Sequence, residues 1–251
     1  GMARLGATVW TGDIHPTWDD LAITPGTMLK WILGGAPYVA CDIGGFTGET
    51  TAPLLARWMQ LGAFMPTMRV HSTHTATPHF PFLWPEPYSS YMKAALEMRY
   101  QLLPYHYSLA HRMFSEGRMW IRPLAAAFAG DAVAATLASQ FLDGDLLVAP
   151  VLREDSSFSA YLPTGTWYRV ATAAHVKQTT VVGPTWVNGT AAEDEVPVWA
   201  PAGAVVPFAP VLQHTGALPG GPLEILVYGG ADGAFVLVED DGETTAYASG
   251  Q

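Results

Sequence analysis

The clearest indication of the architecture lies at residues 38–48, which are Tyr38-Val39-Ala40-Cys41-Asp42-Ile43-Gly44-Gly45-Phe46-Thr47-Gly48. The first four residues are nearly all apolar, and Pro37 and Asp42 bound the run. A short run of this kind is typical of a strand that is buried on both faces, as in a parallel sheet. The paired glycines after it suit two structures equally: a loop whose backbone approaches a ligand closely, or a tight turn into a helix.

Strand-like and helical segments alternate around this run. Short strand-like segments are expected at 7–10 and from residue 63 to 66, and helical spacing covers residues 17–33, 51–61 and 89–115. We expect Pro25 and Gly26 to divide the first helical segment into two pieces, and Pro104 to kink or break the last one. This alternation is typical of βαβ units and predicts a parallel sheet up to about residue 120.

The pattern changes after residue 120, where short β-like runs are separated by glycine and proline. These runs are 145–151, 159–162, 167–170, 179–182, 196–199 and 204–208. Their spacing predicts an antiparallel β-sandwich. After a Gly/Pro-rich linker at 216–222, we expect segments 223–228 and 234–238 to pair as a small hairpin. The fold class is therefore α/β plus all-β.

Composition excludes several classes of partner. The formal net charge is -10, which argues against nucleic acid and against an anionic membrane surface, whereas a neutral sugar is compatible. The single cysteine excludes a disulfide framework. No apolar run approaches the roughly 20 residues of a membrane helix. The start of the chain, Gly1-Met2-Ala3-Arg4, lacks the apolar region of a secretory signal, which favours a cytoplasmic location.

Three polar residues follow strand-like runs, at the places where barrel and open α/β enzymes carry their chemistry: Asp13, Asp42 and His71. Asp13 lies near Trp10, and apolar neighbours that disfavour the charged carboxylate suit a general acid. The alternative is a turn aspartate that caps the next helix. His71 suits hydrogen bonding to sugar hydroxyls, with a purely structural hydrogen bond as the alternative.

The order and spacing of the motifs carry more weight than any single one. The chain contains Trp10-Thr11-Gly12-Asp13, then Asp42-Ile43-Gly44-Gly45-Phe46, then Arg57-Trp58-Met59-Gln60-Leu61-Gly62-Ala63-Phe64-Met65-Pro66, with Arg69-Val70-His71 close behind. Further matches are Arg99-Tyr100-Gln101-Leu102-Leu103-Pro104-Tyr105, Arg122-Pro123-Leu124, Gln140-Phe141-Leu142-Asp143-Gly144-Asp145 and Asp240-Asp241-Gly242. Together they resemble glycoside hydrolase family 31, of the α-glucosidase type, over nearly the whole chain.

The resemblance implies a domain plan. Residues 1–120 correspond to the last three βα units of a (β/α)8 catalytic barrel. Residues 121–215 correspond to the proximal C-terminal β-sandwich, and residues 216–251 to the beginning of a distal β domain.

The resemblance also implies roles for individual residues. Asp13 occupies the position of the general acid/base. Trp10 corresponds to a wall of the −1 sugar subsite, which Asp42 and Phe46 also line. His71 corresponds to the histidine that hydrogen-bonds the −1 sugar. The Arg57-Trp58 pair is assigned to packing beneath the site.

One departure from the family pattern concerns the mechanism. A retaining glycosidase needs two carboxylates about 5 Å apart on either side of the scissile bond. The family nucleophile lies on the fourth barrel strand, before the first residue of this chain, and a substrate-binding arginine is missing with it. Glu49, Asp19 and Asp20 are the nearest acids in sequence, and nothing marks them as a replacement.

The resulting expectation is a retaining α-glucosidase that hydrolyses terminal α-linked glucosyl residues of oligosaccharides, with this chain supplying the acid/base half of the site. The alternatives are an inactive carbohydrate-binding or structural fragment, and an α-xylosidase or transglucosidase relative. An incomplete barrel leaves open sheet edges, which predicts a homo-oligomer or a complementing N-terminal barrel half.

No metal or other cofactor is expected. His71, His74 and His79 lie in one loop, but their spacing matches no zinc pattern. The Asp240-Asp241-Gly242 run lacks the alternating ligands of a calcium loop, and a turn explains it better.

Overall fold

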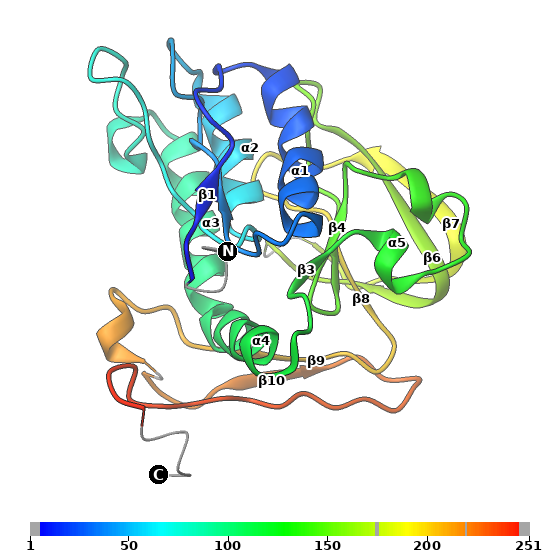
Figure 1. Ribbon diagram of the computed structural model, residues 1–251. Helices are drawn as coiled ribbons and strands as arrows, with labels where there is room; N and C mark the ends of the chain where they lie inside the picture. The colour runs from blue at the N-terminus through cyan, green and yellow to red at the C-terminus, as the bar shows by residue number, and fades with distance from the viewer. Residues whose placement is uncertain (1–5, 174–175, 219, 246–251) are drawn as a thin grey trace.

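The computed structural model describes residues 6–173, 176–218 and 220–245 (Figure 1). Its N-terminal part contains two short parallel strands, β1 (Val9–Trp10) and β2 (Val39–Ala40), with Val9 opposite Val39. A third segment continues the parallel arrangement, since Thr67 N donates to Val39 O at 3.3 Å and Ile43 forms a parallel bridge with Val70. Three extended segments therefore run side by side in the same direction.

Helices alternate with these strands as the sequence predicts. They are α1 (Trp18–Leu33), α2 (Ala52–Gly62), α3 (Tyr88–Gln101) and α4 (Leu103–Glu116). The break between α3 and α4 falls at Leu102, and Pro104 lies in the first turn of α4, so the predicted interruption there is confirmed. Proline is tolerated in a first turn because its missing N–H has no partner there in any case.

Two local predictions are wrong. The segment with Pro25 and Gly26 is one continuous helix, α1, because buried residues on both sides of Pro25, such as Leu21 and Met28, hold it against the core. Residues 63–66 form turns after α2 instead of starting a strand, and the strand pairing begins at Thr67. These turns place Met65 against the only thiol of the chain, the fully buried Cys41, with a sulfur–sulfur distance of 3.7 Å.

Beyond α4 the chain forms a six-stranded antiparallel sheet in the order β3-β4-β5-β8-β6-β7. Its strands are β3 (Ile121–Arg122), β4 (Phe141–Asp143), β5 (Leu146–Val148), β6 (Ser157–Arg169), β7 (Thr180–Thr190) and β8 (Val198–Pro201), and the short helix α5 (Leu124–Ala127) follows β3. The predicted runs 159–162 and 167–170 belong to one long strand, β6, which is irregular between Leu162 and Gly165.

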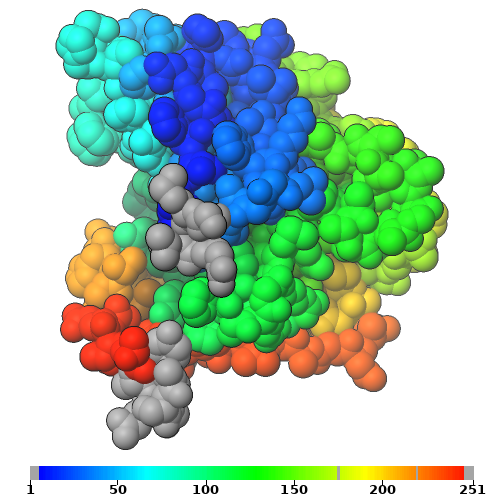
Figure 2. All heavy atoms as spheres, viewed as in Figure 1, coloured from blue at the N-terminus to red at the C-terminus, as the bar shows by residue number. Residues whose placement is uncertain are grey.

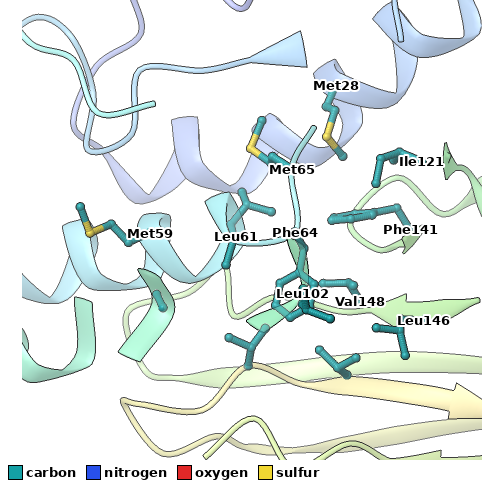
Figure 3. Packing of buried hydrophobic residues seen from close by; sticks show 14 of the residues in the cluster. Met28, Met59, Leu61, Phe64, Met65, Leu102, Ile121, Phe141, Leu146 and Val148 are labelled. Carbon is teal, nitrogen blue, oxygen red and sulfur yellow. The ribbon is translucent and has the colours of Figure 1, made fainter. Parts of the chain in front are cut away.

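The core strands of this sheet are buried on both faces. Leu146 and Val148 belong to the cluster that also contains α1 and α2, whereas Leu147 between them belongs to a second cluster beneath α5. Side chains alternate across a strand, so an apolar run of this kind fills two cores at once. Figure 3 shows Met28, Phe64 and Leu102 converging on Phe141 and Val148, which joins the helical part to the sheet.

A separate two-stranded antiparallel sheet pairs β9 (Val205–Phe208) with β10 (Glu224–Val227). The predicted hairpin between 223–228 and 234–238 is therefore wrong, because β9 is the partner of β10. Residues 234–238 instead lie along α4: Phe235 stacks on Tyr105 at 5.1 Å, and Val238 N donates to Ser108 Oγ at 2.9 Å. Figure 2 shows this C-terminal part as a strip beneath the rest of the molecule.

Among the described helices, none combines the length and the apolar composition that crossing a bilayer requires. The first residues, on which the prediction of a missing secretory signal rests, lie outside the described part of the chain.

Candidate functional site

Three loops follow the parallel segments and are bound to one another. We call them the first loop (11–17), the second loop (42–50) and the third loop (71–79). Phe46 N and Thr47 N both donate to Ile14 O, at 2.7 and 3.3 Å, which joins the second loop to the first. Thr73 N donates to Phe46 O at 3.0 Å, which joins it to the third. The second loop is therefore the centre of the assembly.

The two glycines of the second loop allow this close packing. Gly44 and Gly45 have φ angles of +92° and +87°, a region that L-residues with side chains rarely adopt. A Cβ on Gly44 would lie 2.7 Å from His79 Nδ1, and one on Gly45 would overlap the backbone of Pro16. Close packing against neighbouring protein segments therefore requires these glycines, a reason distinct from both interpretations left open by the sequence.

Asp13 lies in the first loop, and its side chain is exposed. It is not the cap of α1, because Thr17 holds that position and its hydroxyl accepts a hydrogen bond from Asp20 N at 3.1 Å. The Asp20 carboxylate in turn accepts from His15 N at 2.6 Å. The capping alternative for Asp13 is therefore wrong, and no hydrogen bond or ion pair links its carboxylate to any other described residue. Trp10, at the end of β1, is 51% exposed.

Asp42 lies two residues after the end of β2 and is only 1% exposed. Its Oδ1 forms an ion pair with Arg69, whose side chain is 42% exposed. Its Oδ2 has no hydrogen-bond partner within the described chain. A buried carboxylate with one open lone-pair position and a cation at the surface is suited to hold a polar ligand.

Arg69 was not among the predicted site residues, although it stands in the quoted motif. The signal was its spacing: in an extended segment residues 69 and 71 point to the same side, so Arg69 and His71 share a face. His71 stacks on Phe46 with ring centroids 5.2 Å apart and an interplanar angle of 21°. The structure thus brings Phe46 and His71 together, and places Arg69 against Asp42.

The third loop is anchored at its far end. His79 is buried, and its Nδ1 lies 2.7 Å from Ile43 O, so this nitrogen carries the proton and donates it. Burial lowers the pKa of His79, which favours this neutral form. The Glu49 carboxylate accepts from Thr77 N at 3.1 Å. Glu49 and Asp20 therefore both have structural partners, and neither is a free second carboxylate.

The described residues contain no group of three or more His, Cys, Asp or Glu side chains arranged to hold a metal ion. Of the three loop histidines, His71 stacks on Phe46, His79 is turned to Ile43 O, and His74 is exposed.

Arg57 connects α2, the helix that follows the second loop, to the region of the six-stranded sheet. Its side chain is buried, and it donates to Ser156 Oγ at 2.9 Å, Glu195 O at 3.0 Å and Ala191 O at 3.3 Å. Gln60, one turn further along α2, donates to Glu193 O at 2.7 Å. The Arg57-Trp58 pair is thus a packing element, and its arginine binds the loop residues before β6 and between β7 and β8.

Comparison with known proteins fits this arrangement. Residues 1–109 match the glycosyl hydrolases family 31 TIM-barrel domain, and residues 117–206 match the glycosyl hydrolase family 31 C-terminal domain. The chain is 36% identical over 220 residues to the lysosomal alpha-glucosidase of Bos taurus, covering 82% of this chain and 24% of that protein. It is 37% identical over 242 residues to the alpha-glucosidase of Hordeum vulgare, covering 95% of this chain and 27% of that protein.

Solved structures show the same relationship. A dextranase of this family from Flavobacterium johnsoniae, complexed with isomaltotriose, superposes with a TM-score of 0.87 at 28% identity, covering 96% of this chain and 31% of that one. An alpha-xylosidase from Xanthomonas citri gives a TM-score of 0.86 at 32% identity, covering 97% and 28%. The chain therefore spans only about a quarter to a third of the length of these relatives. Since two successive domain models of one family match 1–109 and 117–206, the chain belongs to glycoside hydrolase family 31.

Proposed function

We propose that this chain supplies the acid/base half of a retaining α-glycosidase site that hydrolyses terminal α-linked glucosyl residues of oligosaccharides. The observation that carries the proposal is the convergence of three loops at the carboxyl ends of three parallel segments, with an exposed Asp13 on the first of them. The alpha-glucosidases among the relatives support the choice of substrate.

In this proposal each predicted site residue has a distinct task. Asp13 protonates the leaving oxygen and later removes a proton from the attacking water, as one carboxyl group does in a double displacement. Trp10 and Phe46 present apolar ring faces to the sugar. His71, held by its stack on Phe46, and Asp42, held by Arg69, offer hydrogen bonds to sugar hydroxyls.

The proposed reaction needs a second carboxylate, which we expect from another polypeptide segment. β1 pairs only with β2 among the described strands, so its other edge offers unpaired backbone groups. We propose that a second copy or a complementing N-terminal barrel half adds to this edge. The proposal keeps the domain limits expected from the sequence, which are 1–120 for the barrel part, 121–215 for the proximal sandwich and 216–251 for the distal domain. A monodisperse monomer in light scattering, unchanged by an added N-terminal half, would contradict it.

The test is hydrolysis of an aryl α-glucoside by the chain alone and by the chain mixed with an N-terminal barrel half. We expect activity in the mixture, and its loss by a factor of 100 or more, roughly, in Asp13→Asn, because general acid catalysis contributes on the order of 10²–10⁴-fold. Asp19→Asn is the matched control, since Asp19 is an exposed acid in the same region. Full activity in Asp13→Asn would refute the role of this residue. An aryl α-xyloside assayed in parallel tests the xylosidase alternative.

A second candidate is a non-catalytic sugar-binding chain, and one observation favours it. A cavity of about 430 Å³ between α1 and the six-stranded sheet is lined by one aromatic ring and several hydroxyl and amide groups, including Ser157, Phe158, Ser159 and Asn188. Mixed apolar and polar linings of this kind suit a sugar ring. Saturable binding of maltose that Phe158→Ala abolishes and Asp13→Asn leaves unchanged would support this candidate over the catalytic one.

A further inference from the structure

A second cavity, of about 100 Å³, lies between α4 and the turn that joins β4 to β5. Three arginines line it: Arg112 from α4, Arg118 from the connection after α4, and Arg122 from β3. The chain has 12 lysines and arginines against 22 acidic residues, so three of its few cations meet at one point. Such a concentration of positive charge in a strongly acidic protein calls for a physical explanation.

The hydrogen bonds that these arginines make within the chain do not use all of their N–H donors. Arg122 donates from Nη2 to Gly144 O at 2.7 Å, but its Nε is buried without a hydrogen-bond partner in the described chain. Arg112 is engaged with Glu116: its Nε forms an ion pair with Oε2 at 3.4 Å, and its Nη2 donates to the same oxygen at 3.5 Å. Arg118 is exposed and forms no hydrogen bond or ion pair with any described residue. A buried donor without a partner is costly, by about 1–3 kcal/mol.

The charges around the cavity do not cancel. One carboxylate, that of Asp145, belongs to the lining, and Glu116 is engaged with Arg112 and half exposed. Burial lowers the pKa of Arg122; Asp145 opposes this effect, whereas Arg118 and Arg112 add to it by like-charge repulsion. Three guanidinium groups against the two carboxylates of Asp145 and Glu116 leave one positive charge in excess, which a bound anion would relieve.

From this geometry we propose that the cavity formed by Arg112, Arg118 and Arg122 binds a tetrahedral oxyanion, either free phosphate or the phosphate group of a sugar phosphate. Its volume is about three times the roughly 30 Å³ of a liquid water molecule, which suits a small anion. Guanidinium groups match phosphate oxygens with paired, charge-assisted hydrogen bonds. The site is independent of the loops that carry the proposed glycosidase chemistry.

The test is titration of the whole chain with inorganic phosphate at constant ionic strength, followed by calorimetry and by the thermal unfolding midpoint. We expect saturable heat and a saturable rise in Tm that chloride does not produce, because a ligand that binds only the folded chain stabilises it. Arg118→Gln should weaken binding about tenfold or more, since it removes a charged donor. Lys177→Gln, which removes an exposed cation elsewhere, should bind phosphate like the wild type.

Two further arms make the test decisive. Asp145→Asn should tighten phosphate binding, because it removes the carboxylate that faces the anion; weaker binding in this variant would contradict the proposal. Glucose 6-phosphate that binds more tightly than inorganic phosphate identifies the ester as the ligand, and the reverse order identifies the free ion. Equal effects of phosphate and chloride, or unchanged binding in Arg118→Gln, would overturn the site.

Discussion

Gly12 and Gly45 have nearly the same backbone conformation but different surroundings. Their φ angles are +88° and +87°, yet a Cβ on Gly12 meets nothing within 4 Å, whereas one on Gly45 overlaps Pro16. Replacement of Gly12 by alanine should cost only the conformational strain, about 1–2 kcal/mol. Gly45→Ala should cost an additional 1–3 kcal/mol or so, because the first and second loops must separate. Urea unfolding of both variants measures the difference, and equal losses would contradict the close approach.

Protonation of His106 predicts how stability depends on pH. His106 is buried, with its Nε2 2.7 Å from a carboxylate oxygen of Asp143. Burial lowers its pKa and outweighs the opposing effect of Asp143. The unfolded chain, with a histidine pKa of about 6.5, therefore takes up the proton more readily than the folded chain does. His79, whose pKa burial also lowers, acts in the same direction.

The free energy of unfolding should consequently be highest above about pH 6.5, and it should fall as the pH drops below that value. Denaturant unfolding at pH 7.5 and pH 5.5 measures this, and His106→Gln should reduce the difference between the two values. His74→Gln, an exposed control, should keep it. Stability that stays constant or increases toward pH 5.5 would show that the carboxylate of Asp143, and not burial, dominates.

At the scale of elements, α2 depends on one arginine. Arg57 donates to Ser156, Ala191 and Glu195 on segments more than 90 residues away in the sequence. Arg57→Lys should destabilise the chain by about 2–4 kcal/mol, because one ammonium group cannot make the bonds of a planar fork and each bond to a charged group contributes about 1.5–3 kcal/mol. Thermal unfolding checks this, with Arg153→Lys as the control at an exposed arginine. A loss below 1 kcal/mol, roughly, would contradict it.

The elements themselves were largely predictable, and the exceptions have physical causes. Helical spacing and buried runs placed α1 to α4 and β2 because periodicity reports which face is buried. It did not show that α1 continues through Pro25, since tertiary packing there outweighs one lost hydrogen bond. The sequence also did not predict that β10 pairs with β9, because strand pairing depends on the neighbours in space and not on adjacency in the chain.

The candidate site was predictable in its residue types but not in its contacts. Asp13, Asp42 and His71 were proposed because polar residues that follow strands gather at one edge of a parallel sheet. The ion pair of Asp42 with Arg69 could not be derived, because it joins residues 27 positions apart. Nor could the sequence decide that Thr17 rather than Asp13 caps α1.

At the scale of the whole molecule, the helical part and the sheet share one core. The larger cluster includes Leu102, Phe141 and Val148, which Figure 3 labels, together with Tyr105 and Val198, and it therefore crosses the proposed limit at residue 120. Tyr105 Oη donates to Asp143 O at 3.0 Å and accepts from Asp145 N at 2.8 Å across the same limit. The helical part and the sheet are thus packed into one body and are not independent domains.

A chain cut after Gly117 should consequently not fold by itself. Its isolated N-terminal piece would expose the apolar faces that α1, α2 and α4 present to the sheet, and we expect it to lack a cooperative thermal transition. Circular dichroism and calorimetry of the piece, alone and mixed with residues 118–251, test this. A sharp transition in the isolated piece would show that the shared core is dispensable.

The buried Cys41 has a practical consequence. Burial raises the pKa of its thiol to about 12, so the folded chain holds it as an unreactive thiol against Met65. Alkylating reagents attack the thiolate, and they can reach this fully buried sulfur only when the structure around Cys41 opens. The rate at which iodoacetamide modifies this single thiol therefore measures how often the structure around Cys41 opens. No label has to be introduced for this measurement.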